Sequence, residues 1–500
     1  MAADSLKILK KRLIEIARLA SVGDVLSWDQ EVYLPRKGVE ARANALACIN
    51  GITHQKLSAI DDDRLLSKLK KQVDAKKLSG GNAAIVTETW RTYARQKKLS
   101  EAFVAQMSET TSRAYAAWVR AREESDFGMF LPWLKKIVDL KREEAGLVGF
   151  NDSPYDALID EYEPGSTVQS IEALFSDLKQ FLVPFIGALV RSGDKVDPAR
   201  ILGAFPLDQQ LAFNRFVSEQ MGFDYAAGRL DQSPHPFTAS FHTQDVRITT
   251  RMREDDLMYA LGSTIHETGH GLYEQGLPLR HFGTPLGESS FASIHESQSR
   301  LWENNIGRST AFWKYFYPKI RKEFPEPFKK IPLSEFMRII NRVEPSLIRT
   351  EADEVTYNLH VILRFEIEKE MIEGTLPLED LPAIWNAKMK KYLGISVPND
   401  RLGVLQDMHW AVGDIGNFPA YTLGTLYAAQ FYTAMQRAVP DLSEKIAAGD
   451  FATPREWLRE NIYRHGRRYR VADLVKRATG EYPNSRYFIE YLKERYGAGV

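Results

Sequence analysis

Helical periodicity along most of the chain is the strongest constraint on what it can fold into. Apolar residues recur every three or four positions, and Pro, Gly or Asp mark the breaks between these stretches. The pattern predicts long amphipathic helices at residues 40–57, 82–97, 100–124, 129–147, 168–191 and 207–221. It returns from residue 333 onward, apart from a turn-rich segment at 394–424. The predicted fold class is therefore mainly α.

Length and charge bound the organisation of the chain. The 500 residues could form two or three domains, but no Ser/Gly/Pro-rich linker and no clear repeat divides them. We therefore predict a single domain over residues 1–500, with two lobes that could flank a cleft. Lys plus Arg and Asp plus Glu both number 66, so the net charge is zero. This balance gives no support for a nucleic acid partner.

Cysteine use and apolar patterning bear on the compartment. Cys48 is the only cysteine, which excludes an internal disulfide and suits a reducing environment. No apolar run approaches the roughly 18–20 residues that span a bilayer, so no membrane partner is expected. Residues 1–21 carry several lysines, but Asp4 and Glu15 interrupt them, and a helical apolar stripe favours a first structural helix over a transit peptide. We expect a cytoplasmic protein.

Helical periodicity fails over residues 231–250. Alternating β-branched and aromatic residues there, including Phe237, Phe241, Val246 and Ile248, predict short strands. The small sheet would lie directly before the next predicted helix, at 255–275. Since the free edge of a sheet can hydrogen-bond an extended peptide, this position suits a peptidase.

The sequence His266-Glu267-Thr268-Gly269-His270 lies inside that helix. Residues i and i+4 share one helix face, so the two imidazoles can bind one tetrahedral zinc, and Glu267 can reach water that the ion activates. The alternative is a pair of ordinary core or surface histidines, but the chain has only 10 His, which makes a chance match less frequent. Gly262, Gly269 and Gly271 disfavour a helix, so we expect another backbone to pack closely on this one. The motif favours a zinc peptidase.

A catalytic zinc needs a third protein ligand besides His266 and His270. Residues of a suitable type follow or precede the motif at short range: His242, His281, Glu274, Glu288, His295 and Glu296. We choose Glu296, because a loop at 276–289 can bring a second predicted helix, at 290–305, back alongside the first. Its alternative is a surface ion pair with Arg300 at i+4. His295 lies about 100° around the helix from Glu296, so both are not expected to bind the same ion.

Further motifs occur in order along the chain. Trp28-Asp29 precedes Leu34-Pro35 and Gly38; later motifs are His235-Pro236-Phe237, Asp245-Val246-Arg247-Ile248-Thr249, His295-Glu296-Ser297-Gln298-Ser299, Ile348-Arg349-Thr350-Glu351-Ala352-Asp353 and Gly403-Val404-Leu405-Gln406-Asp407-Met408-His409-Trp410. Together with the histidine motif they closely resemble the carboxypeptidase Taq family of thermostable zinc metallocarboxypeptidases, over about residue 28 to beyond Gly424. The resemblance implies Glu296 as third ligand and a helical zincin with a long central groove, similar to neurolysin and angiotensin-converting enzyme. It also implies a homodimer that removes single C-terminal residues from peptides with broad specificity.

Roles for the other motif residues follow from the chemistry. Glu267 is the expected general base. Tyr421, which resembles the tyrosine of related helical zincins, is expected to stabilise the developing negative charge, with His409 and His235 as further candidates; a core aromatic is the alternative for Tyr421. Arg349, in the family's Ile-Arg-x-x-Ala-Asp element, is chosen to bind the substrate carboxylate, unless it pairs internally with Asp353.

The remaining expectations concern neighbouring positions and competing functions. His235 and Gln406 are expected to contact substrate, and Asp353 could orient a zinc-bound histidine through its free ring N–H. Cobalt or manganese could replace zinc. Among enzymes, the alternative is an oligopeptidase or dipeptidyl-carboxypeptidase on the same scaffold. From another class, a helical binding protein with a structural zinc is disfavoured, because such sites usually have four protein ligands, often cysteines.

Overall fold

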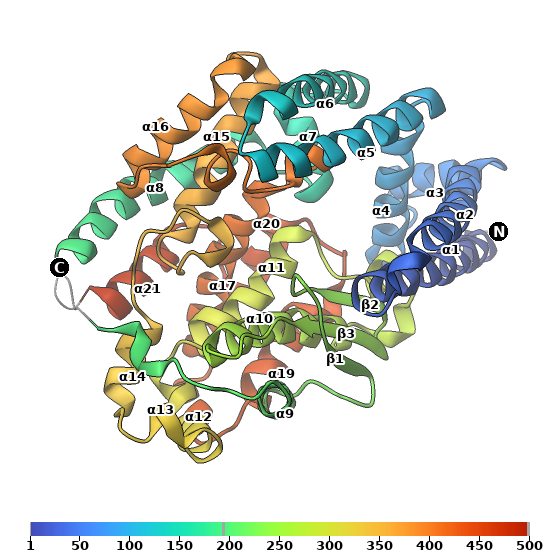
Figure 1. Cartoon of the computed structure of the whole chain (residues 1–500). Coiled ribbons are helices and arrows are strands. Elements are labelled where there is room, and N and C mark those ends of the chain that lie inside the picture. The colour runs from blue at the N-terminus through green and yellow to red at the C-terminus, as the bar shows by residue number, and fades with distance from the viewer. Residues whose placement is uncertain (1, 193–195, 498–500) are drawn as a thin grey trace.

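The computed structural model describes residues 2–192 and 196–497. Three helices pack together at its centre (Figure 1): the consecutive helices α10 (Leu257–Gln275) and α11 (Ala292–Arg300), and the distant α17 (Phe418–Ala438). α11 contacts both α10 and α17. The centre of the fold is therefore built around the helix that carries the histidine motif.

The predicted long helices are confirmed, with ends that differ by a few residues. They are α2 (Val39–Ser58), α4 (Gly80–Lys97), α5 (Glu101–Glu124), α6 (Phe127–Val148), α8 (Val168–Ser192) and α9 (Leu207–Met221). Polar caps set some of these ends: the Ser100 side chain accepts a hydrogen bond from the Phe103 amide at the start of α5. The first helix, α1 (Ala2–Val32), is longer than its amphipathic first 21 residues.

Many of the other helices lie in two groups, above and below the centre in the view of Figure 1. In the upper group of that view, α5, α6, α7 (Pro154–Tyr162) and α8 pack with α15 (Tyr357–Glu373) and α16 (Leu381–Leu393). The lower group contains α9 with α12 (Thr310–Glu323), α13 (Pro325–Phe328), α14 (Leu333–Ile340) and α19 (Ala452–Asn461). The remaining helices are α3 (Leu65–Asp74), α18 (Leu442–Ala447), α20 (Val471–Thr479) and α21 (Arg486–Tyr496).

The predicted strands are confirmed as β2 (Thr238–His242) and β3 (Asp245–Thr250) of a three-stranded sheet beside α10, whereas the third strand, β1 (Gly228–Gln232), begins before residue 231 and was not predicted. The order of the sheet is β1-β3-β2, with β1 parallel and β2 antiparallel to β3. Both β2 and β3 contact α10. Since β3 lies in the middle, β2 has one edge that pairs with no strand among the described residues.

The helix α8 corrects one expectation from the sequence. By length and composition alone it could cross a membrane, whereas we expected no such segment. A single helix of this kind is weak evidence, because core helices pass the same test. Lys179 on α8 pairs with Glu366 on α15 at 2.5 Å, and Lys369 on α15 pairs with Glu172 on α8 at 2.6 Å. These ion pairs and a row of buried apolar residues bind α8 to the upper group.

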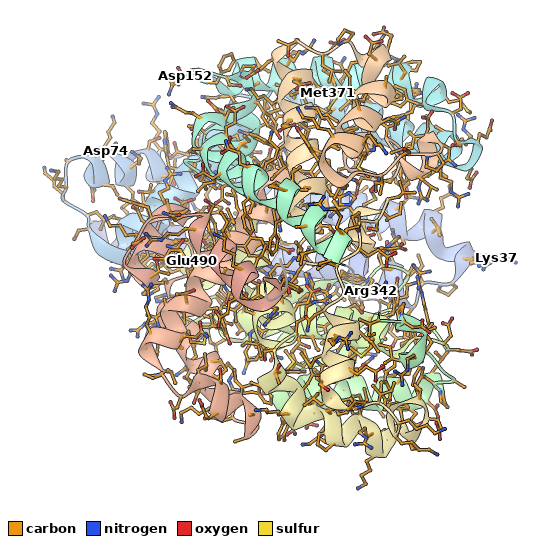
Figure 2. All side chains as sticks on the ribbon, turned by 90° about the vertical axis from the view of Figure 1, so that its left-hand side faces the viewer. Lys37, Asp74, Asp152, Arg342, Met371 and Glu490 are labelled. Atoms are coloured by element: carbon orange, nitrogen blue, oxygen red, sulfur yellow. The ribbon has the colours of Figure 1, made fainter. Side chains whose placement is uncertain are left out.

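The N-terminal helices have a small core of their own. Leu6 and Leu9 of α1 pack with Leu66 and Leu69 of α3 and with Val86 of α4. α1 also contacts β2, so this N-terminal unit lies next to the sheet. In the side view of Figure 2, side chains fill the space between the ribbons, and the charged Lys37, Asp74 and Asp152 point outward at the periphery.

Candidate active site

The helix α10 positions both motif histidines on one face. Asp256 caps its first turn by accepting a hydrogen bond from the Tyr259 amide at 3.1 Å, and the helix then runs without interruption to Gln275. The imidazole rings of His266 and His270 lie with centroids 5.0 Å apart. Both are half-buried, so an ion bound between them would be largely shielded from water.

Two glycines let α11 approach closely enough to complete the site. A side-chain carbon added at Gly269 of α10 would lie 2.7 Å from the Ser299 Cα atom, and one at Gly424 of α17 would lie 2.7 Å from the Glu296 Cβ atom. Any larger residue at either position would push α11 away. The expected close packing is therefore correct at Gly269, but it is wrong at Gly262, where nothing lies within 4 Å.

His266, His270 and Glu296 form a cluster with the dimensions of a metal site. Glu296 Oε2 lies 3.6 Å from His270 Nε2 and 3.9 Å from His266 Nε2, and all three ligand atoms lie within 4.8 Å of one another. Tetrahedral zinc with bonds of about 2.0–2.1 Å would separate its ligand atoms by roughly 3.4 Å. The two carboxylate–histidine distances lie close to this value, so the donor set fits a divalent cation.

A second carboxylate fixes the orientation of His266. Its Nδ1 lies 2.7 Å from Glu303 Oε2, which leaves Nε2 to face the ligand cluster. Glu303 lies on the π-helical segment Leu301–Ile306, which continues α11. Burial alone would raise the pKa of Glu303, but Arg300 and His266 outweigh it and lower the pKa to about 2. Glu303 is therefore an anion at neutral pH.

Asp353, which we expected to orient a histidine, has a different function. Its carboxylate accepts hydrogen bonds from the Glu344, Val355 and Thr356 amides and from the Thr356 hydroxyl, at 2.9–3.0 Å. These bonds fix the turn at residues 354–356, directly before α15. The expectation for Asp353 is wrong, because Glu303 provides the carboxylate at His266.

His295 and Glu274 flank the other ligand, His270. The rings of His295 and His270 stack with centroids 4.4 Å apart, and His295 Nε2 lies 2.9 Å from Glu274 Oε1. His270 Nδ1 has no hydrogen-bond partner among the described residues, whereas His266 Nδ1 contacts a carboxylate. His295 and Glu274 are therefore neighbours of the cluster and not part of it.

Glu267 lies between α10 and the sheet. Its Oε2 accepts a hydrogen bond from the Thr238 hydroxyl of β2 at 2.7 Å. Burial raises the pKa of the Glu267 carboxyl above its usual value, and nearby His266 limits the rise. A buried carboxylate with a raised pKa is suited to accept a proton from water near neutral pH.

Arg349 is buried among aromatic rings and makes an ion pair with Asp407. Its Nη2 lies 2.9 Å from Asp407 Oδ1, its Nη1 donates to the Tyr357 hydroxyl at 3.0 Å, and its guanidinium lies 5.2 Å from the centre of the Tyr421 ring. The alternative that Arg349 pairs with Asp353 is therefore wrong.

Asp407 is shared between two arginines. Arg364, which is fully buried, donates from Nε to the other carboxylate oxygen at 2.7 Å. Burial alone would raise the pKa of Asp407, but the two guanidinium groups hold it well below its usual range. Two cations and one anion leave this buried cluster with an excess of one positive charge, which can attract a substrate carboxylate.

Tyr421 and His409 lie together beside Arg349. The Tyr421 hydroxyl and His409 Nε2 are 3.2 Å apart. Burial raises the pKa of Tyr421 and lowers the pKa of His409, so at neutral pH the phenol keeps its proton and the imidazole is uncharged. A neutral phenol can donate a hydrogen bond to a developing oxyanion.

Gln406 and His235, which we expected to contact substrate, differ in position. Gln406 accepts a hydrogen bond from the Arg349 amide at 3.0 Å and donates to the Leu347 carbonyl at 3.1 Å. Its side chain is therefore engaged in holding the backbone at Arg349. His235 is exposed and lies three residues before Thr238, the hydrogen-bond partner of Glu267.

A cavity of about 830 Å³ lies beside the site. α1, β2 and the loop after α10 line it, together with Glu274 and His295. Thr238 lines it too, so the cavity reaches the residue that contacts Glu267. It is large enough for several residues of an extended chain along the free edge of β2.

Sequence reasoning assigned no function to several residues of the site: Glu303, Asp407, Arg364 and Thr238. The spacing of Glu296, Arg300 and Glu303 at i, i+4 and i+7 marks one helix face and could have revealed Glu303. Asp407 lies inside the motif at residues 403–410, but its two arginine partners are 58 and 43 residues away in sequence. No local pattern predicts that pairing.

Glu163 is a buried carboxyl group that contacts both α11 and α17, and its effect on stability can be measured. Its carboxylate lies 2.5 Å from the Ser293 hydroxyl of α11 and 3.3 Å from the Tyr427 hydroxyl of α17. Burial raises the pKa of Glu163 to about 7. Between roughly pH 4.5 and pH 7 the unfolded chain therefore loses a proton that the folded protein keeps, and stability falls as the pH rises.

Glu163→Gln should remove that penalty, since the amide is neutral at every pH. We expect the difference in unfolding free energy, variant minus parent, to increase by about 3 kcal/mol from pH 4.5 to pH 8, because the parent loses stability as Glu163 becomes ionised. Denaturant unfolding of both proteins at these two pH values measures the change. A variant-to-parent difference that is the same at both pH values would contradict a raised pKa.

Two imidazoles, a carboxylate and an adjacent buried glutamate define the donor set of a metal-dependent hydrolase of the metallopeptidase class. The chain belongs to the carboxypeptidase Taq (M32) metallopeptidase family, whose family pattern matches residues 8–496. The resemblance noted in the sequence is thereby confirmed. The chain is a metallocarboxypeptidase, and its family implies a divalent metal.

Named relatives and a solved structure agree with this assignment. The chain is 40% identical over 496 residues to thermostable carboxypeptidase 1 of Thermus thermophilus, with 97% of this chain and 96% of that protein covered. It is 38% identical over 484 residues to carboxypeptidase 1 of Bacillus subtilis, with the same coverage. The crystal structure of an M32 carboxypeptidase from Deinococcus radiodurans superposes with a TM-score of 0.95 at 39% identity, covering 99% of each chain.

Proposed function

We propose that this protein is a zinc-dependent carboxypeptidase that releases single C-terminal amino acids from peptides with broad specificity. The observation that carries the proposal is the cluster of His266, His270 and Glu296 beside the buried Glu267. A zinc ion held by the cluster would supply Lewis-acid activation of the scissile carbonyl and of the attacking water. Cobalt or manganese could replace zinc in vitro, because the same ligands suit all three metals.

Glu267 is proposed to move the proton in this reaction. Its Oε2 accepts the proton of the attacking water and then gives it to the departing amine. Two observations support this assignment: the hydrogen bond from Thr238 holds the carboxylate in position, and burial raises its pKa. Tyr421 is proposed to donate its phenol proton in a hydrogen bond to the developing oxyanion, while His409 keeps the phenol in place.

Arg349 is proposed to bind the C-terminal carboxylate of the substrate. The excess positive charge that it shares with Arg364 and Asp407 supports this choice, as does its contact with Tyr421. With the carboxylate at Arg349, the upstream part of the peptide can lie along β2 in the 830 Å³ cavity. The scissile bond of the last residue then lies between these two anchors.

A pair of matched substrates tests the proposal. We expect an N-blocked dipeptide to be hydrolysed to one free amino acid, and its C-terminally amidated twin to react at least about a hundredfold more slowly, since a buried arginine discriminates strongly between charged and neutral ends. Activity should follow the metal content when the ion is removed with a chelator and zinc is restored. Equal rates on the two substrates, or release of dipeptides from longer peptides, would favour the oligopeptidase or dipeptidyl-carboxypeptidase alternative.

Other properties are proposals that rest on the family resemblance or on composition. We propose an architecture similar to that of neurolysin and angiotensin-converting enzyme, with one domain whose two lobes flank the groove. We also propose a homodimer in the cytoplasm. Light scattering of the purified protein tests the oligomeric state directly.

A further inference from the structure

Arg300 lies between two carboxylates of the candidate metal site. Its Nε donates a hydrogen bond to Glu296 Oε1 at 2.7 Å, and its Nη1 donates to Glu303 Oε2 at 3.1 Å. Glu303 in turn bonds His266 Nδ1 at 2.7 Å. One guanidinium thus contacts one proposed ligand directly and reaches a second through a single carboxylate.

The surroundings of Arg300 leave its side chain little freedom. Only 14% of the side chain is exposed, and the guanidinium lies 4.3 Å from the centre of the Tyr357 ring. Burial alone would lower the pKa of Arg300, but Glu296, Tyr357 and Glu303 outweigh it, so the guanidinium remains charged. Its planar fork presents two N–H groups in fixed directions, one for each carboxylate.

The contact with Arg300 makes the two oxygens of Glu296 different. Oε1 accepts a hydrogen bond from Arg300 Nε at 2.7 Å, whereas Oε2 faces the histidines at 3.6 and 3.9 Å and accepts only a long hydrogen bond, from the Ser299 hydroxyl at 3.4 Å. A carboxylate without such a partner can rotate and offer both oxygens to a cation, which adds a ligand to it. That extra ligand would occupy the space that water and the scissile carbonyl need in a catalytic site.

We propose that Arg300 is a positioning residue: it restricts Glu296 to coordination through one oxygen and, through Glu303, holds His266 with Nε2 toward the cation. The inference rests on the proposed metal site and assigns Arg300 no contact with substrate. The ion pair between Glu296 and Arg300, which the sequence offered as an alternative to metal binding, is thereby part of the metal site.

Cobalt-loaded variants test this function by a spectroscopic signature. Four-coordinate cobalt(II) absorbs visible light much more strongly than five- or six-coordinate cobalt(II). We expect Arg300→Met to bind cobalt with clearly weaker visible bands, and to show a kcat lowered about 10- to 100-fold with KM changed less than about threefold. Arg300→Lys keeps the charge but not the fork, so its bands should weaken too.

Arg95→Met is the matched control. Arg95 is also 14% exposed and also contacts two carboxylates, with Nη2 lying 2.6 Å from Glu144 and 3.1 Å from Glu161. Its partners lie on α6 and α7, away from the metal ligands, so its loss should leave the cobalt spectrum and kcat unchanged.

Unchanged cobalt bands in Arg300→Met, or an effect on KM alone, would overturn the inference. If Arg300→Met does not fold, bands of parental strength in Arg300→Lys would overturn it as well. If the parent protein itself binds no cobalt or hydrolyses no peptide, the proposed function fails, and that result is distinct from an unchanged variant of an active parent.

Discussion

Glu267→Gln is expected to lower kcat for an N-blocked dipeptide by about 10³–10⁴-fold, the upper part of the range for loss of general acid–base catalysis. The amide cannot accept the proton of the attacking water. The Thr238 hydroxyl can still donate to the amide oxygen, so the side chain should stay in place. KM should change little, because Glu267 is proposed to act on water and not on the substrate ends. Steady-state kinetics with equal metal loading measure both quantities.

Two controls make this result specific. Metal content should equal that of the parent, since Glu267 is not one of the three clustered ligands. Glu366→Gln removes another carboxylate, which lies on α15 and pairs with Lys179 of α8 and Lys388 of α16, and it should leave kcat unchanged. Turnover of Glu267→Gln within tenfold of the parent, with metal bound, would exclude Glu267 as the base.

Helices and strands were predictable because their signals are local. Apolar spacing placed the long helices to within a few residues, and Pro, Gly and polar caps such as Ser100 marked their ends. Loss of that spacing over residues 231–250 placed β2 and β3, but not β1, which begins at Gly228. The order of its strands and the arrangement of the helices around α10 depend on contacts between distant segments, which a single sequence does not reveal.

The residues of the candidate site likewise include some that local spacing predicts and others that depend on distant contacts. The histidine pair follows from i, i+4 spacing on one helix, and the structure brings Glu296 to the same place. Asp353 was assigned by proximity in a motif, but its carboxylate binds the turn before α15. Glu303, on the π-helical segment after α11, occupies the position at His266. The least predictable functions were therefore those that depend on which side chains contact one another in the folded structure.

The cluster of Arg349, Arg364 and Asp407 can keep a buried positive charge that is still able to bind a substrate carboxylate. Asp407 balances one of the two guanidinium groups, so the interior holds only one excess positive charge. A substrate carboxylate that enters next to Arg349 would neutralise that excess without displacing Asp407. Arg364 is fully buried and contacts the far oxygen of Asp407, so it can hold the aspartate in place when Arg349 is absent.

Arg349→Ala is accordingly expected to lower kcat/KM for peptides with a free C-terminus by about 10²–10³-fold, since it removes a buried partner of the substrate carboxylate. Because Asp407 keeps Arg364, the variant should fold and bind metal as the parent does. The slow hydrolysis of C-terminally amidated peptides should change little, so the preference for a free carboxylate should largely disappear. Steady-state kinetics on the free and amidated peptides measure this preference, as the ratio of their kcat/KM values, in the variant and the parent. A ratio equal to that of the parent would mean that another group binds the carboxylate.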